Sequence, residues 1–420
     1  MTTKFDTAAI AGFGDYLRNE AATSIGPIGA FVCAEGMSRD GFGDAPSLLA
    51  PLGEFISGEP SVLVKQGFTE LQRKMVQLGD TVTAAGKQYA GVEDRNAQIA
   101  AGLDTNARHR SPLSHPALWP FPVSELDLTK PDRPPASFTV DNGGGVGGKV
   151  LEVLNWIWVQ FKVDGGRSFT DSLVEPLVGN PKSIQANGRA WQSAAAALGD
   201  VAGTMGAHLV ELTTNGWQDR AAEALMQFAI TCWKDGAAWV AQQVGDFIAQ
   251  GFDRVGQVST ELAELAIRAI KQILELAVKL AARALPVIGW AWTAIESLGS
   301  VALEFLGIDI DNLLDDIKKA IELGKQVLGI FETIKNIVET TKAYLNQVKE
   351  IVDFARSIPE LDSVDPVEVA NKVKDLPEKQ KAVTDSLAQV GPALGDLDRG
   401  ANASKKDGSE PRINKETLRP

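Results

Sequence analysis

An uninterrupted heptad pattern constrains the fold of this chain more than any other feature. Between residues 64 and 92, apolar side chains recur at alternating steps of four and three. This period fits an α-helix that packs its apolar stripe along another helix, and it fits no β-strand. The sequence therefore predicts an all-α fold. The apolar positions of the pattern are Val64, Phe68, Leu71, Met75, Leu78, Val82, Ala85, Tyr89 and Val92.

A second pattern predicts a hairpin of two long helices. A seven-residue apolar repeat runs from Ile184 to Leu212, and Pro181 precedes it in a position that suits a first helical turn. The repeat breaks at an Asn-Gly-Trp sequence that ends at Trp217, and helical spacing then resumes to about Val255. Two antiparallel helices joined by a turn explain this break. We expect Trp217 to be exposed at the tip of the hairpin.

Composition along the chain predicts five segments. Residues 1–105 are expected to form an N-terminal helical hairpin, and residues 151–306 a second helical domain with an apolar extension. Between them, residues 106–150 hold seven prolines and then a glycine cluster, which is typical of a linker. Residues 307–390 are expected to form an amphipathic helical region. Residues 391–420 are expected to be a disordered tail, because they are polar and charged.

Two further expectations concern how these segments pack. Trp119 and Phe121 in the linker offer a means of attachment to a neighbouring domain. The heptad pattern of residues 310–355 needs cover for its apolar stripe, and we expect it to pack on residues 262–306 of the same chain. Packing between two copies would instead give a homo-oligomer, so the oligomeric state stays open.

Charge and composition argue against several classes of protein. The formal net charge of −13 argues against a nucleic-acid binder, which needs a basic face. The first residues lack a basic segment followed by an apolar core, so we expect no Sec signal peptide. No apolar run reaches the length of about 18 residues that a membrane-spanning helix requires. Cys33 and Cys232 form no disulfide framework, and two buried thiols are favoured over one long-range bridge.

No constellation of residues predicts catalysis, a cofactor site or a metal site. The stretch Gly143–Lys149 has the glycine and lysine spacing of a phosphate-binding loop, but Val150 stands where Ser or Thr would hold magnesium. His109 and His115 lie in the linker without cysteines or paired carboxylates at metal-ligand spacing, and His208 is expected on a helix. The sequence therefore predicts that the protein is not an enzyme.

The turn at Trp217 resembles that of the WXG family of type VII (ESX) secretion substrates of actinobacteria. Members of this family fold as two antiparallel helices joined by a Trp-x-Gly turn. Here the turn reads Trp-Gln-Asp from Trp217, followed by Ala221 and Ala222, as in the family's W-x-G-x-A-A sequence. Asp219 stands where the family has glycine. Gly216, on the other side of the tryptophan, is expected to supply the backbone freedom instead.

A second motif of the same family lies at the end of the first heptad pattern. Type VII substrates carry Tyr-x-x-x-Asp/Glu at the end of a hairpin's second helix. Tyr89 and Glu93, with Asp94 beside them, match this motif and lie one helical turn apart on one face. The turn at Phe42 and Gly43 resembles the Phe-Gly turn of related secretion targets. In the family, the turn of one hairpin and the Tyr motif of another form one export signal, so the resemblance implies that Phe42 or the turn tryptophan faces Tyr89.

The resemblance implies a secreted or cell-surface protein that is exported without a Sec signal peptide and acts by binding or assembly rather than catalysis. The implied partner is the membrane ATPase of the type VII machinery, with a small Trp-x-Gly protein or a chaperone as further candidates. A membrane is another candidate target. Two alternative functions remain: a membrane-active or pore-forming effector, suggested by the apolar residues 262–306, and the delivery part of a polymorphic toxin whose C-terminal enzyme is absent from this chain.

Overall fold

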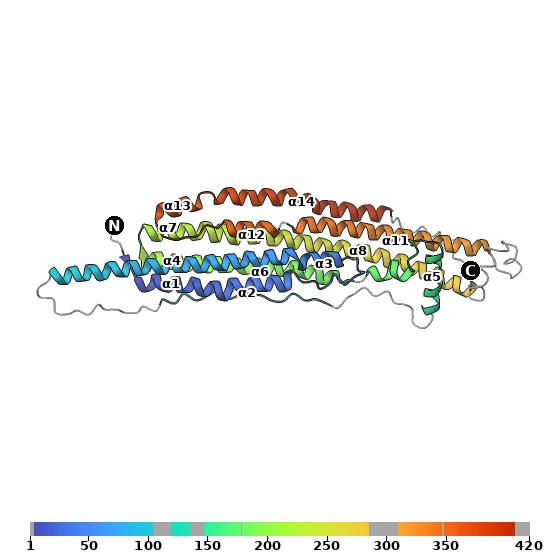
Figure 1. Ribbon diagram of the computed structural model, residues 1–420, viewed down its shortest axis with the longest axis horizontal. Helices are drawn as coiled ribbons and strands as arrows, with labels where there is room; N and C mark the ends of the chain where they lie inside the picture. Colours follow the sequence, from blue (N-terminus) through green and yellow to red (C-terminus); the bar gives the residue numbers. More distant parts are fainter. Residues whose placement is uncertain are drawn as a thin grey trace.

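The computed structural model describes residues 4–103, 119–134, 147–177, 179–284, 310–346 and 348–407. Within these residues the protein is an elongated helical bundle whose only strands are the short β1 (Lys4–Phe5) and β2 (Trp217–Gln218) (Figure 1). The predicted all-α fold class is therefore confirmed. The helices in chain order, with η for short π- or 3-10-helical segments, are α1 (Thr7–Glu20), η1 (Ala21–Ile25), α2 (Gly26–Phe31), η2 (Val32–Gly36), α3 (Ala50–Ser57), α4 (Glu59–Leu103), α5 (Gly147–Gln160), η3 (Thr170–Val174), η4 (Glu175–Leu177), α6 (Pro181–Glu211), η5 (Leu212–Gly216), α7 (Arg220–Ala229), η6 (Ile230–Ala238), α8 (Trp239–Ala284), α11 (Ile310–Leu345), α12 (Val348–Ser357), α13 (Pro366–Val373) and α14 (Leu376–Asp407).

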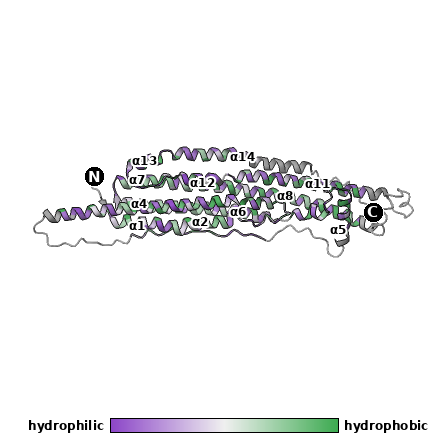
Figure 2. Ribbon diagram, in the orientation of Figure 1, coloured by the Kyte–Doolittle hydropathy of each residue, from purple (hydrophilic) through white to green (hydrophobic). Residues whose placement is uncertain are grey.

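Helices α1 and α4 pack against each other through a close approach of their backbones. A Cβ atom on Gly14 of α1 would lie 2.7 Å from the carbonyl oxygen of Gly79 in α4, so this contact requires glycine. The heptad pattern of α4 supplies the apolar side of the contact. Figure 2 shows hydrophobic and hydrophilic residues alternating along the helices, as expected when each buries one face. The buried residues of the α4 pattern include Val64, Leu71, Met75, Leu78 and Val82.

The second hairpin consists of α6 and the continuous α7–η6–α8 segment. Helix α6 begins at Pro181, as predicted, and the Asn180 side chain caps it by accepting a hydrogen bond from the Ser183 backbone N–H at 3.3 Å. We call α4 and the α1–η1–α2–η2 segment that packs along it the first hairpin. Helix α6 packs against α8 and also contacts α2 and η2 of the first hairpin. The two hairpins therefore share one hydrophobic core, whereas the sequence suggested two domains joined by a linker.

Part of the predicted linker lies extended against both hairpins. We call residues 119–134 the strap. Trp119 Nε1 donates to Asp6 Oδ2 at 3.0 Å, and the Phe121 ring makes an edge contact with Phe13 of α1, with centroids 5.6 Å apart. At the other end of the strap, Arg133 Nη1 donates to the Asn187 side chain of α6 at 2.9 Å. The attachment through Trp119 and Phe121 is thus confirmed, and the strap is part of the bundle.

The C-terminal helices form a further layer on the two hairpins. Helix α11 packs on α8, as expected for packing within one chain, while α12 lies on α4 and α13 on α7. Helix α14 contacts both α8 and α11, and Figure 1 shows it running along one side of the bundle. Helix α14 continues through residues 391–407, which the sequence analysis assigned to a disordered tail. Residues 408–420 lie outside the described part of the chain.

A buried lysine attaches this layer to α4. Lys74 is 6% exposed, and its Nζ donates to the carbonyl oxygen of Arg356 at 2.8 Å and to that of Ile358. The Arg356 carbonyl lies in the last turn of α12, and the Ile358 carbonyl follows that turn. A helix leaves the carbonyl groups of its last turn without internal hydrogen-bond partners. Burial lowers the pKa of Lys74, and the nearby Glu70 carboxylate partly offsets this effect.

Helix α5 begins at Gly147, inside the predicted linker, and stands across the long axis of the bundle in Figure 1. Cys33 is half-buried and Cys232 is buried, and both are free thiols. None of the helices in the described ranges is both long and apolar enough to cross a membrane. Residues 285–306 of the predicted apolar region, and His109 and His115, lie outside those ranges.

The Lys74→Met variant tests the attachment of the C-terminal layer. It keeps an apolar side chain of similar length but leaves two carbonyl oxygens near the end of α12 without a donor. Because an unsatisfied buried acceptor costs about 1–3 kcal/mol, we expect the free energy of unfolding to fall by about that amount. Urea denaturation followed by far-ultraviolet circular dichroism measures the change.

Lys65→Met is the matched control, because Lys65 lies exposed on the same helix. We expect its free energy of unfolding to stay within about 0.5 kcal/mol of the wild-type value. Equal stability of the two variants would show that the buried ammonium group does not hold the layer.

Candidate functional site

Trp217 lies at the turn between α6 and α7 and is fully buried. Strand β1 pairs antiparallel with β2, so Phe5 lies opposite Trp217. The Asp6 backbone N–H donates to the carbonyl oxygen of Gly216 at 2.6 Å. The expectation of an exposed Trp217 is therefore wrong. Residues 4–6 cover the turn, although they lie far from it in the sequence.

Tyr89 of α4 packs against the same turn. Its ring makes an edge contact with Trp217, with centroids 5.8 Å apart and planes at 75°, and its centroid lies 4.8 Å from that of Phe5. The Tyr89 hydroxyl donates a hydrogen bond to Asp219 Oδ2. The tyrosine motif of the first hairpin and the tryptophan turn of the second thus lie together. We call the contact of Phe5, Tyr89, Trp217 and Asp219 the joint.

Asp219 has two roles in the joint, and the sequence analysis recognised neither. Its Oδ1 accepts a hydrogen bond from the Ala222 backbone N–H at 2.9 Å and so caps the N-terminus of α7. Its Oδ2 accepts the hydrogen bond from Tyr89. Aspartate before a helical apolar run is a known capping signal, so the first role was accessible from sequence. The second role depends on the position of α4.

Gly216 is required for space rather than for backbone freedom. A Cβ atom on Gly216 would lie 2.9 Å from the Cβ of Ala9 in α1. Its φ angle is not positive, so the predicted role of Gly216 as the flexible residue of the turn is wrong. Asp6 lies on the same side of the turn. Its Oδ1 caps α1 by accepting a hydrogen bond from the Ala8 backbone N–H at 2.9 Å.

Glu93 and Asp94 lie one turn beyond the joint on α4, and both are exposed. Neither forms an ion pair within the described ranges of the chain. Helix α4 continues to Leu103, and Figure 1 shows this end projecting past the other helices. Two apolar side chains on the projecting part are exposed as well, Val92 by 45% and Ile99 by 57%. The joint therefore supports a helix end that offers acidic and apolar side chains to solvent.

Phe42 and Gly43 lie near the opposite end of the first hairpin and take no part in the joint. Phe42 is fully buried and packs against Gly53, where a Cβ atom would lie 2.8 Å from that of Phe42. Gly43 has a φ of +72°, which glycine adopts without strain. Of the two aromatic residues that the resemblance offered as a partner for Tyr89, the structure places Trp217 there.

The environment of Tyr89 favours its neutral form. Burial raises the pKa of Tyr89 to about 12, and the hydrogen bond to the Asp219 carboxylate acts in the same direction. The hydroxyl group therefore remains protonated, and able to donate to Asp219, at every physiological pH. The hydrogen bond from Tyr89 to Asp219 therefore joins α4 to the Trp217 turn.

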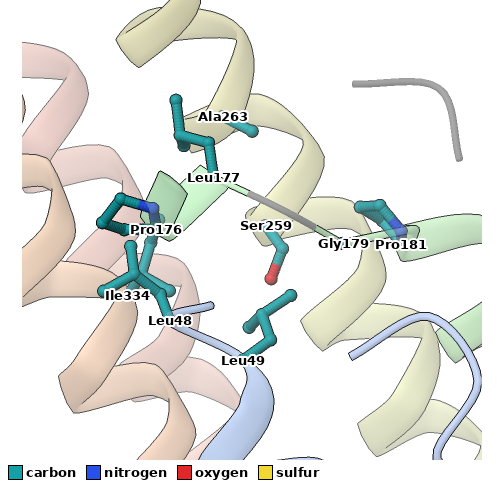
Figure 3. A pocket seen from close by; sticks show the side chains of 9 residues that line it. All are labelled: Leu48, Leu49, Pro176, Leu177, Gly179, Pro181, Ser259, Ala263 and Ile334. Atoms are coloured by element: carbon teal, nitrogen blue, oxygen red, sulfur yellow. The ribbon is translucent and has the colours of Figure 1, made fainter. Parts of the chain in front are cut away.

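Within the described residues, no group of three or more His, Cys, Asp or Glu side chains lies together as metal ligands would. His208 packs its ring against Tyr16, with centroids 4.8 Å apart. A pocket of about 20 Å³ lies where α8, α11 and the start of α6 meet the residues before α3, and Figure 3 shows it lined mainly by apolar side chains around Ser259. It is too small for an organic substrate.

Comparisons with known proteins add no relative: no protein-family model, no curated protein and no solved structure matches the chain.

The tyrosines allow the joint to be tested by alkaline titration. The chain has three tyrosines, and burial raises the pKa of each above the usual value of 10. We expect the folded protein to show no tyrosinate absorbance near pH 10 and a first step near pH 12, from Tyr89. Because unfolded Tyr89 ionises first, its contribution to stability is complete below pH 10 and is lost as the pH rises towards 12.

The Tyr89→Phe variant should lack the step near pH 12. Tyr344→Phe is the control and should keep it, because Tyr344 is buried at a different place, with its hydroxyl donating to the Phe247 carbonyl oxygen. A tyrosine that ionises near pH 10 in the folded wild-type protein would contradict this description of the joint.

Proposed function

We propose that the protein is a type VII secretion substrate whose export signal is the end of α4 supported by the joint. In this proposal Tyr89, Glu93 and Asp94 form the signal, and Trp217 positions it. The protein leaves the cytoplasm without a Sec signal peptide. It then acts by binding or assembly, as a secreted or cell-surface protein without a catalytic site.

The observation that carries this proposal is the contact between Tyr89 and the Trp217 turn. The two motifs come from different hairpins, and the resemblance to the WXG family requires them to lie together. Their ring centroids are 5.8 Å apart, and Asp219 links the turn to the tyrosine hydroxyl. If the Tyr-x-x-x-Glu sequence were a chance match, its tyrosine would not be expected to pack against a tryptophan turn.

The burial pattern supports a division of roles within the signal. Trp217 is fully buried, so a partner cannot contact its ring without opening the joint. Glu93 and Asp94 are exposed and make no ion pair within the described ranges. We therefore infer that a partner reads the carboxylates and the exposed apolar side chains of α4, while Trp217 and Asp219 hold the helix at a fixed angle.

The chemistry of this surface suggests the kind of partner. A projecting helix with acidic residues and the exposed side chains of Val92 and Ile99 fits a groove that is apolar and lined by basic residues. In the type VII system, the membrane ATPase is the proposed receptor. A chaperone or a small Trp-x-Gly protein that covers this end before export is compatible with the same surface.

A secretion assay in an actinobacterial host that carries a type VII system tests the proposal. The Glu93→Gln and Asp94→Asn double variant removes both charges and leaves the buried joint unchanged. We expect its amount in the culture filtrate to fall by about tenfold or more, the factor that corresponds to a binding loss of about 1.4 kcal/mol. The cytosolic amount should persist. Immunoblots of filtrate and lysate measure both.

Glu54→Gln is the matched control, because Glu54 is an exposed acidic residue on α3 that takes no part in the joint. It should be secreted like the wild type. Tyr89→Ala should also lower secretion, but removing its ring weakens the joint, so circular dichroism must show an intact fold for this variant. Normal secretion of the double variant would refute the proposed signal.

A further inference from the structure

Asp6, which follows Phe5 of the joint, connects three parts of the chain. Its backbone N–H donates to the carbonyl oxygen of Gly216 in the turn at 2.6 Å. Its side-chain oxygen Oδ1 accepts hydrogen bonds from the first backbone N–H groups of α1, including that of Ala8 at 2.9 Å. The other oxygen, Oδ2, accepts the hydrogen bond from Trp119 Nε1 at 3.0 Å. Asp6 is therefore bonded to the turn, to α1 and to the strap at the same time.

Trp119 also lies next to the turn itself. A Cβ atom on Gly216 would lie 3.7 Å from Cζ2 of the Trp119 indole, at ordinary van der Waals distance. Gly216 directly precedes Trp217 in the sequence. The strap thus reaches the turn in two ways, through the indole ring and through the hydrogen bond to Asp6.

Neighbouring rings hold Trp119 in this position. Its ring stacks on Phe121 of the strap, with centroids 6.2 Å apart and planes at 13°. Phe121 in turn makes edge contacts with Phe13 of α1 at 5.6 Å and with His208 of α6 at 5.3 Å. The Nε2 atom of His208 lies 2.9 Å from the carbonyl oxygen of Pro122. The strap is therefore fixed to one helix of each hairpin, close to the end of α6 that leads into the turn.

The position of Tyr89 depends on residues that Asp6 holds in place. The Tyr89 ring packs on Phe5 and on Trp217, which pair across β1 and β2. Each of these strands is two residues long. An isolated pair of such short strands is marginally stable at best, so the pairing needs support from outside. The hydrogen bonds of Asp6 to the turn and to the strap supply this support.

We propose that the strap keeps the joint closed, and that Trp119, acting through Asp6, is a positioning residue for Tyr89. Without the indole hydrogen bond, Asp6 is no longer tied to the strap, and the pairing of β1 with β2 opens more often. Each opening uncovers Trp217 and removes Phe5 from the ring of Tyr89. The signal on α4 is then complete only in chains whose strap is in place. This role in export rests on the proposed function, whereas the closing of the joint by the strap is a property of the fold.

Hydrogen–deuterium exchange of the full chain tests the proposal, because local opening exposes the amides that the pairing protects. The Trp119→Phe variant removes the indole N–H and keeps an aromatic ring against Phe121. We expect the amides of residues 4–6 and 217–218 to exchange about tenfold faster or more, as for the loss of one hydrogen bond to a charged acceptor. Exchange in α12 should stay at the wild-type rate, which shows that the rest of the bundle is intact. Peptide-resolved mass spectrometry measures these rates.

Arg189→Met is the matched control, because it removes one hydrogen bond to the other end of the strap. Arg189 of α6 donates from Nη2 to the carbonyl oxygen of Asp132 at 3.0 Å. We expect this variant to leave the exchange of residues 4–6 at the wild-type rate. Equal acceleration in both variants would contradict the role of Trp119, because general loosening of the strap would then account for it.

A double-variant cycle shows whether Trp119 acts through Asp6. Asparagine is as good a helix cap as aspartate, so Asp6→Asn keeps the cap of α1 and removes the charged acceptor of the indole N–H. If this hydrogen bond carries the effect, Trp119→Phe should add no further acceleration in the Asp6→Asn background. Acceleration factors that multiply would refute the proposal, because the two residues would then act independently.

The exchange experiment and the secretion assay have separate outcomes. Wild-type exchange of residues 4–6 in Trp119→Phe would overturn the role of the strap, whatever the Glu93→Gln and Asp94→Asn variant shows. Faster exchange together with normal secretion of Trp119→Phe would support the role of the strap and contradict the proposed function, in which the joint positions the signal.

Discussion

The pairing of Phe5 with Trp217 joins β1 to a turn in the second hairpin, and the joint depends on it. The pairing covers the tryptophan, places Asp6 where it accepts a hydrogen bond from Trp119 of the strap, and leaves Tyr89 in contact with both aromatic rings. A turn that would otherwise expose a large apolar ring thus becomes part of the core. In the proposed function, the surface that a partner contacts is the projecting end of α4.

Helix α4 is the element that connects the parts of the bundle. On one side it meets α1 at Gly14 and Gly79, where no larger residue fits. On another it holds the C-terminal layer through Lys74, whose ammonium group caps the end of α12. Before its projecting end it carries Tyr89. Because one rigid helix makes all three contacts, a shift of α4 at either packing surface would move Tyr89 relative to Trp217. The proposed export signal therefore depends on packing along the whole helix.

The elements of the fold could be predicted where local chemistry specifies them. The heptad pattern from Val64 gave a helix because the period of apolar residues shows which face a helix buries. Pro181 marked the start of α6, since proline suits a first helical turn. The helix after Gly391 was missed, because its polar composition resembles that of a disordered tail. The ordered path of the strap was predicted only through its aromatic residues, because a proline-rich segment has no periodic pattern of apolar residues. Side chains of other elements hold the strap in place.

For the candidate site, the sequence by itself determined the Trp217 turn, the spacing that puts Tyr89 and Glu93 on one face of a helix, and the capping of α7 by Asp219. Periodicity and capping are local properties, so they can be read without knowing what lies nearby. Only the tertiary structure decided that Tyr89 meets Trp217 rather than Phe42, that Trp217 is buried, and that Asp219 accepts a hydrogen bond from Tyr89. The physical reason is that an apolar stripe specifies that a helix must be covered but not by which partner, and close contacts such as that of Gly14 with Gly79 make the choice.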